Sequence, residues 1–199
     1  MEGHREYVGG DFERIGLWQF NTLKDIADIQ PNTTILDIAC GSLRLGKHLI
    51  PYLNTGKYYG LEAYDRMLNE GIDKELHNDL SKRPSFAINS TFDFNFCPSY
   101  DVAWANSLFS HLVKEDIVKC LSNLKTISSN SSVFYFTYFE ENQQKKEKQN
   151  PTESHARKDF YYKQSTMEEI ANSVGWKLER AKVIHPRSQT IMKGKINES

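Results

Sequence analysis

Short apolar segments typical of buried strands alternate with helical segments along this chain, and this order constrains the fold more than any other feature. The expected strands cover residues 34–38, 57–62, 86–88, 100–104, 132–139, 177–184 and 190–196. The expected helices cover residues 13–27, 43–50, 67–76, 117–124 and 165–174. Because alternating strands and helices form parallel pairs with crossover helices, we expect an α/β fold with a doubly wound, mostly parallel, seven-stranded sheet.

The last two expected strands are separated only by the turn from His185 to Gln189. A parallel connection needs a crossover of a dozen or so residues, so these strands must form a C-terminal antiparallel hairpin. No linker or internal repeat divides the 199 residues, and a chain of this length can build one full-sized core. We therefore expect a single domain over residues 1–199, in which residues 1–30 form an N-terminal helical cap segment.

Residues 140–160 are polar and charged, and they include the stretch KKEKQNPTESHARK. Such a segment has too few apolar side chains to contribute a core element. We expect a mobile loop, which is either a lid that orders on substrate binding or an ordinary solvated loop.

The charge of the chain is nearly balanced, with 25 Lys and Arg against 26 Asp and Glu. Binding of a nucleic acid through its phosphates needs a basic excess, so this class of partner is not expected. No run approaches the roughly 20 apolar residues of a membrane helix, and the amino terminus is too polar for a secretory signal, which predicts a cytoplasmic protein without a membrane partner. The three widely spaced cysteines predict reduced thiols. The sequence contains no cluster of His and Cys residues, so no metal site is expected.

The residues just after the first two strands indicate a ligand site, because open parallel sheets bind ligands beyond the carboxyl ends of their strands. The first strand leads into the sequence LDIACGSLRLG at residues 36–46, whose small residues let a ligand approach the backbone. The second strand ends at Glu62, and a carboxylate there suits the two hydroxyls of a ribose. The two features together indicate a nucleoside ligand.

These segments carry a resemblance to a known family. LDIACGSLRLG and YYGLEAYDRML, at residues 58–68, resemble the first two motifs of class I S-adenosylmethionine-dependent methyltransferases. YDVAWANSLFSHL, at residues 100–112, is similar to the fourth-strand motif of that family, and the closing helix and hairpin resemble its characteristic end. The resemblance covers nearly the whole chain and implies a Rossmann-like methyltransferase fold with S-adenosyl-L-methionine as the cofactor.

The resemblance also implies which residues bind the cofactor. The loop around its methionine part would comprise Asp37, Ala39, Cys40, Gly41, Ser42 and Arg44, and Glu62 would hold the ribose. The adenine would lie near Ala63, Asp93 and Phe94, and the backbone carbonyls of Ala105 and Asn106 would face the ammonium group. For Arg44 two readings stay open, a partner for a cofactor or substrate carboxylate and a surface ion pair.

Two loop positions depart from the family pattern. Ala39 and Leu43 stand where the family commonly has glycine. An alanine at position 39 is tolerated if its φ stays negative, so this departure weakens the match without excluding it.

His111 follows the fourth strand and is the candidate general base, because an imidazole titrates near neutral pH. The alternative is a helix-capping or buried histidine. The candidate substrate contacts are Tyr7, Trp18, Phe109, Tyr138 and His185, with ordinary packing as the alternative.

The predicted function is transfer of a methyl group to a small-molecule acceptor by in-line displacement. The segment Ala105-Asn106-Ser107-Leu108 lacks the Asn/Asp-Pro-Pro-aromatic motif common in enzymes that methylate nucleobase amines. One alternative is a noncatalytic S-adenosylmethionine-binding regulator or partner subunit. Another is an NAD-dependent oxidoreductase, although residues 39–44 do not match the G-x-G-x-x-G fingerprint. The sequence does not indicate an oligomeric state.

Overall fold

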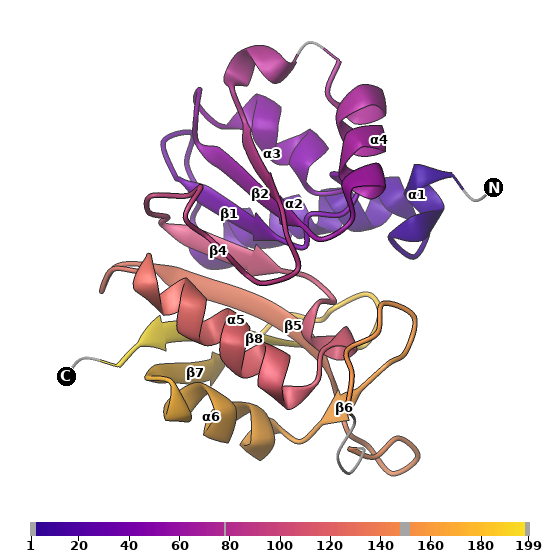
Figure 1. The fold of residues 1–199 in the computed structure, drawn as a ribbon, viewed down its shortest axis with the longest axis vertical. Coiled ribbons are helices and arrows are strands. Elements are labelled where there is room, and N and C mark those ends of the chain that lie inside the picture. The colour runs from indigo at the N-terminus through magenta and orange to yellow at the C-terminus, as the bar shows by residue number, and fades with distance from the viewer. Residues whose placement is uncertain (1–2, 78, 148–151, 198–199) are drawn as a thin grey trace. The chain divides into compact units, whose positions relative to one another are not determined.

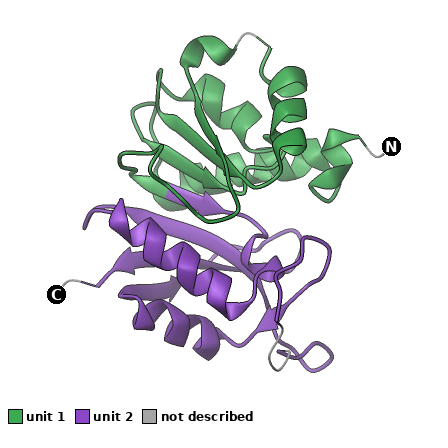
Figure 2. Cartoon of the chain, viewed as in Figure 1, with its two compact units in different colours: residues 1–102 green, residues 103–199 purple. Residues whose placement is uncertain are grey.

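The computed structural model describes residues 3–77, 79–147 and 152–197, and its chain separates into two compact units (Figures 1 and 2). Unit 1 comprises residues 1–102 and unit 2 comprises residues 103–199.

Unit 1 contains three parallel strands, in the order β3, β2, β1. These strands are β1 (Ile35–Ile38), β2 (Tyr58–Glu62) and β3 (Ser85–Ile88). The helices are α1 (His4–Tyr7), α2 (Phe12–Ala27), α3 (Gly46–Tyr52) and α4 (Asp65–Glu75), followed by the short η1 (Asp79–Lys82). Every residue of β1 is buried.

Unit 2 is built around β8 (Thr190–Ile196), which lies antiparallel between β5 (Val133–Glu140) and β7 (Trp176–Arg180). β4 (Val102–Ala105) begins at the last residue of unit 1, and the two-residue β6 (Tyr161–Tyr162) runs parallel to the end of β5. The helices are η2 (Phe109–His111), α5 (Lys114–Thr126) and α6 (Gln164–Ser173). Helices α5 and α6 lie side by side (Figure 1).

An aromatic cluster forms the core of unit 2. Phe109, Phe134, Phe136 and Trp176 are all at most 1% exposed, and their rings meet at centroid distances of 4.6–6.1 Å. The indole N–H of Trp176 donates to the carbonyl of Leu121 on α5, so the one polar atom of this ring is satisfied. Strand β5, which carries Phe134 and Phe136, therefore supplies the centre of this core.

The structure confirms the expected order of elements, the parallel pairs β1–β2 and β2–β3, and the antiparallel hairpin of β7 and β8. Helix α3 differs from the expectation, because it starts at Gly46 and continues through Pro51 to Tyr52. The proline removes only its own N–H donor, and the Leu53 N–H still donates to the Leu49 carbonyl at 2.8 Å. The pattern also missed α1 and β6, which have four and two residues and are too short to show a period.

The expected mobile loop at residues 140–160 is described on both sides of residues 148–151, which lie outside the described residues. Glu147 pairs with Lys114 at 2.5 Å and accepts a hydrogen bond from Thr166 at 2.8 Å. The Ser154 hydroxyl accepts the Val113 N–H at 2.9 Å. These contacts fasten the described ends of the loop to α5 and α6, whereas its role as a lid stays a prediction.

Candidate active site

The loop after β1 and the carboxylate at the end of β2 are joined by hydrogen bonds. The Cys40 N–H donates to a carbonyl of β2 at 3.0 Å, and the Gly41 N–H donates to Oε2 of Glu62 at 2.8 Å. The N–H groups of Ala63 and Tyr64 donate to Oε1 of Glu62 at 2.8 and 3.1 Å. The loop and Glu62 therefore come together at the carboxyl ends of two neighbouring parallel strands, where the sequence places them.

The backbone of this loop is left-handed at three positions. φ is 60° at Ala39, 60° at Gly41 and 63° at Leu43. The condition of a negative φ at Ala39 is therefore not met, and a left-handed non-glycine residue costs about 1–2 kcal/mol. The surroundings hold this conformation, because Leu43 is fully buried and Gly71 of α4 lies so close that an added Cβ would meet the loop backbone at 2.6 Å.

Asp37 lies beneath the loop as a buried carboxylate. It is 3% exposed, and the Tyr58 hydroxyl donates to its Oδ2 at 2.8 Å. Burial raises the pKa of Asp37 to about 7, although the bond from Tyr58 acts in the opposite direction, and the charge of Glu62 adds to the rise. Asp37 therefore resists ionisation near neutral pH.

Glu62 is also buried, at 5% exposed, and burial raises its pKa in spite of three backbone N–H donors. A positively charged ligand near two such carboxylates would favour their ionised forms. The neighbouring Cys40 has its thiol pKa raised by burial, so it stays protonated and neutral. The site is thus suited to bind a cation and lacks a reactive thiolate at this position.

The N-terminal segment contacts the same loop. The Ser42 hydroxyl donates to the His4 carbonyl at 2.7 Å, and Nη1 of Arg44 donates to the Val8 carbonyl at 2.6 Å. Arg44 is 7% exposed, so the interpretation as a surface ion pair is wrong. An added Cβ on Gly41 would lie 2.7 Å from Cγ1 of Val8, which explains the requirement for glycine there.

Other predicted residues of unit 1 have ordinary local contacts. Asp93 is exposed in the loop after β3, where its Oδ1 accepts the Asn95 N–H at 2.9 Å, and Phe94 is 3% exposed. Tyr7, in α1, and Trp18, in α2, are half-buried. The assignments of these four residues to adenine or substrate stay predictions.

In unit 2, the segment after β4 is held by a polar cluster. Ser107 has a φ of 61°, and its N–H donates to Oγ1 of Thr137 at 2.7 Å. Gln189 contacts both the Ser107 and the Thr137 hydroxyls. The His185 ring lies 3.1 Å from Oδ1 of Asn106 through Nε2 and accepts the Arg187 N–H through Nδ1 at 3.0 Å.

These contacts assign the tautomer of His185. Because Nδ1 accepts a backbone N–H, the proton lies on Nε2 and is donated to Asn106. His185 is 3% exposed and uses both ring nitrogens within the protein, so it orients Asn106 at the end of β4. Its contact with a substrate stays a prediction.

His111 differs from His185 in which ring nitrogen carries the proton. Its Nδ1 lies 3.0 Å from the Lys158 carbonyl, which can only accept, and 3.8 Å from Oδ1 of Asp159. The neutral ring therefore carries its proton on Nδ1 and leaves a lone pair on Nε2. The side chain is 29% exposed, so His111 is neither fully buried nor used as a helix cap. This geometry suits a general base.

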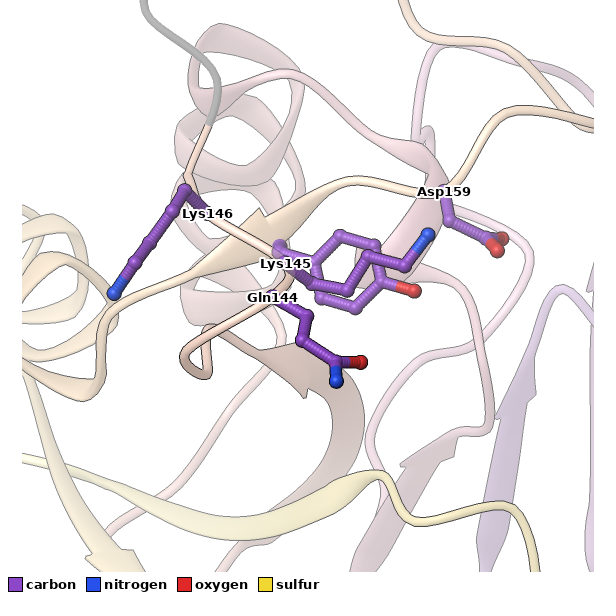
Figure 3. Close-up of a pocket in the computed structure, with 5 residues that line it drawn as sticks. Gln144, Lys145, Lys146 and Asp159 are labelled. Atoms are coloured by element: carbon purple, nitrogen blue, oxygen red, sulfur yellow. The ribbon is translucent and has the colours of Figure 1, made fainter.

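A hollow of about 400 Å³ in unit 2 has Asp159 in its lining (Figure 3). It is lined by Gln144, Lys145, Lys146, Asp159 and Tyr161. The Lys145 ammonium lies 5.8 Å from the centre of the Tyr161 ring. A second hollow, of about 380 Å³, is lined by residues 180–185 and 188–191 of the hairpin, including His185 and Gln189.

Two predicted substrate contacts lie in the core of unit 2. Phe109 is fully buried, with its ring 4.6 Å from that of Phe136, so the structure places it in core packing. Tyr138 is also fully buried, and burial raises the pKa of its hydroxyl to about 12. Within the part of the chain that the structure describes, this hydroxyl has no hydrogen-bond partner.

No sequence pattern marks Tyr58, Lys158, Asp159 or Gln189 as site residues. Tyr58 lies within an expected strand, and nothing in the pattern shows that its hydroxyl reaches Asp37. Asp159 and Lys158 end the charged stretch, directly before the aromatic run FYY at residues 160–162 that could have indicated β6. Among the described residues, no group of three His, Cys, Asp or Glu could hold a metal ion, and no described helix is long and apolar enough to cross a bilayer.

Comparison with known proteins supports the family resemblance. Residues 36–131 match a family described as a methyltransferase domain. The match starts at the second residue of β1 and includes the loop, Glu62 and His111. The resemblance expected from the motifs is confirmed over this range.

Solved structures of low sequence identity show the fold. Magnesium protoporphyrin IX methyltransferase from Synechocystis, solved with bound S-adenosylhomocysteine (SAH), has a TM-score of 0.69 at 14% identity, with 94% of this chain and 86% of that chain covered. An S-adenosylmethionine-dependent methyltransferase from Clostridium acetobutylicum has a TM-score of 0.66 at 13% identity, with 98% and 96% covered. The pyocyanin biosynthetic protein PhzM has a TM-score of 0.67 at 13% identity, with 89% of this chain and 54% of PhzM covered. The expected fold class, a mostly parallel Rossmann-like sheet with antiparallel C-terminal strands, is confirmed.

Proposed function

We propose that this chain, with its methyltransferase domain at residues 36–131, is an S-adenosylmethionine-dependent methyltransferase acting on a small molecule. The observation that carries the proposal is the pair of buried carboxylates, Asp37 and Glu62, around the turn at Gly41. Solved structures of the same fold contain S-adenosylmethionine or its demethylated product, SAH, which supports this choice of ligand.

The residues of unit 1 fit the charge of this cofactor. S-adenosylmethionine supplies an electrophilic methyl group on a sulfonium and carries a second positive charge on its ammonium. Asp37 and Glu62 offer negative charge at low exposure, where electrostatic attraction is weakly screened. Glu62 retains acceptor capacity for a ribose hydroxyl, since a carboxylate has about four lone-pair sites and three are taken by backbone N–H groups.

In unit 2, His111 is the proposed general base. A neutral hydroxyl or amine acceptor must lose a proton as it is methylated, whereas a carboxylate or thiolate need not. The Lys158 carbonyl and the Asp159 carboxylate both face Nδ1, so they orient the ring with Nε2 free to accept that proton. Asn106, oriented by His185, is proposed to offer its backbone carbonyl, with that of Ala105, to the ammonium group.

A small-molecule acceptor is favoured by three observations. The net charge is −1, the segment after β4 lacks the Asn/Asp-Pro-Pro-aromatic motif, and the two hollows of unit 2 have the volume of small-molecule sites. Magnesium protoporphyrin IX methyltransferase and PhzM, which share the fold, have names that refer to small molecules. Cytoplasmic residence remains part of this proposal.

Isothermal titration calorimetry with S-adenosylmethionine, SAH and NAD tests the cofactor. The first two should bind, and NAD should not. Glu62→Gln, which keeps the shape but removes the charge, should weaken binding by about 1–3 kcal/mol. Glu70→Gln on α4, where Glu70 pairs with Arg66 and Lys74, serves as the control. Binding of NAD without either sulfur compound would refute the proposed function.

A further inference from the structure

A buried carboxylate at the end of α4 contacts three basic side chains from two segments of unit 1. Oε1 of Glu75 contacts Nε2 of His4 at 2.6 Å and Nε of Arg5 at 2.7 Å, while Oε2 contacts Nη2 of Arg5 at 2.9 Å and Nζ of Lys47 at 3.0 Å. The Glu75 side chain is only 2% exposed. Its hydrogen bonds to Arg5, His4 and Lys47 outweigh burial and lower the pKa of Glu75 to about 2, so the carboxylate is ionised at neutral pH.

Two of these partners belong to the N-terminal segment that covers the loop after β1. Residues 4–8 receive hydrogen bonds from Ser42 and Arg44, and Val8 packs on Gly41. Helix α1 itself has four residues and buries none of them. A single helical turn is unstable on its own, so the segment depends on polar contacts for its position.

Glu75 supplies the strongest of those contacts. Arg5 binds it with two parallel N–H donors, an arrangement that is charge-assisted and directional. The same guanidinium lies 4.9 Å from the ring centre of Phe12 and 3.0 Å from a carboxylate oxygen of Glu13. If residues 4–8 moved away, Glu75 would keep only Lys47 as a partner among these three.

We propose that Glu75 is a positioning residue that latches residues 4–8 over the loop at residues 39–44 and thereby gates entry and exit of the cofactor. The proposal rests on the proposed function, because it takes that loop as the cofactor site. The latch acts through Arg5 and His4 and does not touch the ligand. Weakening it therefore raises the population of the open state and speeds binding and release together, with little change in affinity.

Stopped-flow measurement of SAH association and dissociation with the full chain tests this gate. Arg5→Gln removes the bidentate pair from an exposed position, and we expect both rate constants to rise about tenfold, the effect of one charge-assisted hydrogen bond, with Kd within about twofold of the unchanged protein. Glu75→Gln should behave in the same way, and Arg5→Lys should restore part of the slow kinetics, since it keeps the charge but loses the paired geometry. Lys74→Gln is the matched control, because Lys74 pairs with Glu70 on the same helix.

Unchanged rate constants in Arg5→Gln, with SAH binding intact, would overturn the latch. A rise in the dissociation rate alone would also overturn it, because that result indicates a direct contact with the ligand. Glu75 is buried, so its substitution can impair folding; Arg5 is 45% exposed in its side chain and keeps the test decisive. Absence of SAH binding to the unchanged protein would instead refute the proposed function.

Discussion

Asp37→Asn gives a direct test of the buried acid at the loop. The substitution keeps the size of the side chain and an oxygen that can accept the Tyr58 hydroxyl, but it removes the ionisable group. The pKa of Asp37 is about 7 in the folded protein and 3.8 in the unfolded chain. Between these values the unfolded chain has lost the proton while the folded protein retains it.

The sign and size of the effect follow from this difference. Because the folded state binds more protons, the contribution of Asp37 to stability falls as the pH rises from about 4 to about 7, and is constant above that range. One pKa unit corresponds to about 1.4 kcal/mol, so the total penalty is about 4 kcal/mol. Asn carries no such penalty. The variant should therefore gain stability over the unchanged protein as the pH rises, by about 3 kcal/mol between pH 5 and pH 8.

Urea unfolding of both proteins at pH 5 and pH 8 measures how the stability gap between them changes with pH. Both proteins share all other titratable groups, so the contributions of those groups to the free energy of unfolding largely cancel in the comparison. Asp25→Asn, on the exposed side of α2, supplies the background for removing a carboxylate. Equal differences in the free energy of unfolding at the two pH values would show that Asp37 ionises freely in the folded protein. The reasoning about burial would then be refuted.

Four further substitutions probe the loop, the core and the base. Ala39→Gly should raise the free energy of unfolding in urea by about 1 kcal/mol, because glycine adopts a left-handed φ without strain. Leu43→Gly should lower the free energy of unfolding, because it removes a fully buried side chain. A lower free energy of unfolding for Ala39→Gly would contradict the strain at this position. Phe136→Ala should lower the free energy of unfolding by about 3–5 kcal/mol, and a loss under 1 kcal/mol would contradict the cluster's role as the core. His111→Gln should reduce turnover about 10²- to 10⁴-fold in an assay of SAH release and leave SAH affinity unchanged, while normal turnover would exclude it as the base.

The fold was predictable because its signals are local and repeated. Residues 34–38 and 132–139 contain the residue types that buried strands require, and the short turn before β8 leaves no alternative to an antiparallel hairpin. The positions of Gly41 and Glu62 followed from strand order alone, since parallel strands end at one edge of a sheet.

Other features depend on contacts that no local pattern contains. Ala39 has a left-handed φ in a loop whose backbone packs against α4 at Ser42, whereas local preference favours a negative φ. Phe109 looks like a site residue from its place after β4, but its ring is buried against Phe136. Glu75 looks like one more charge on an amphipathic helix, and only the fold brings Arg5 to it across 70 residues of sequence.

Three residues at the loop of unit 1 carry a cost in stability. Ala39 and Leu43 hold a backbone conformation that suits glycine, and Asp37 retains a carboxylate where burial opposes its charge. On the proposed function these costs share a cause, because a cationic cofactor needs backbone at close range and uncompensated negative charge beneath it. Stability and binding should therefore respond to Asp37→Asn in opposite directions, with a higher free energy of unfolding at pH 8 and a weaker affinity for S-adenosylmethionine. A variant that gained both would show that the buried charge does not serve the cofactor.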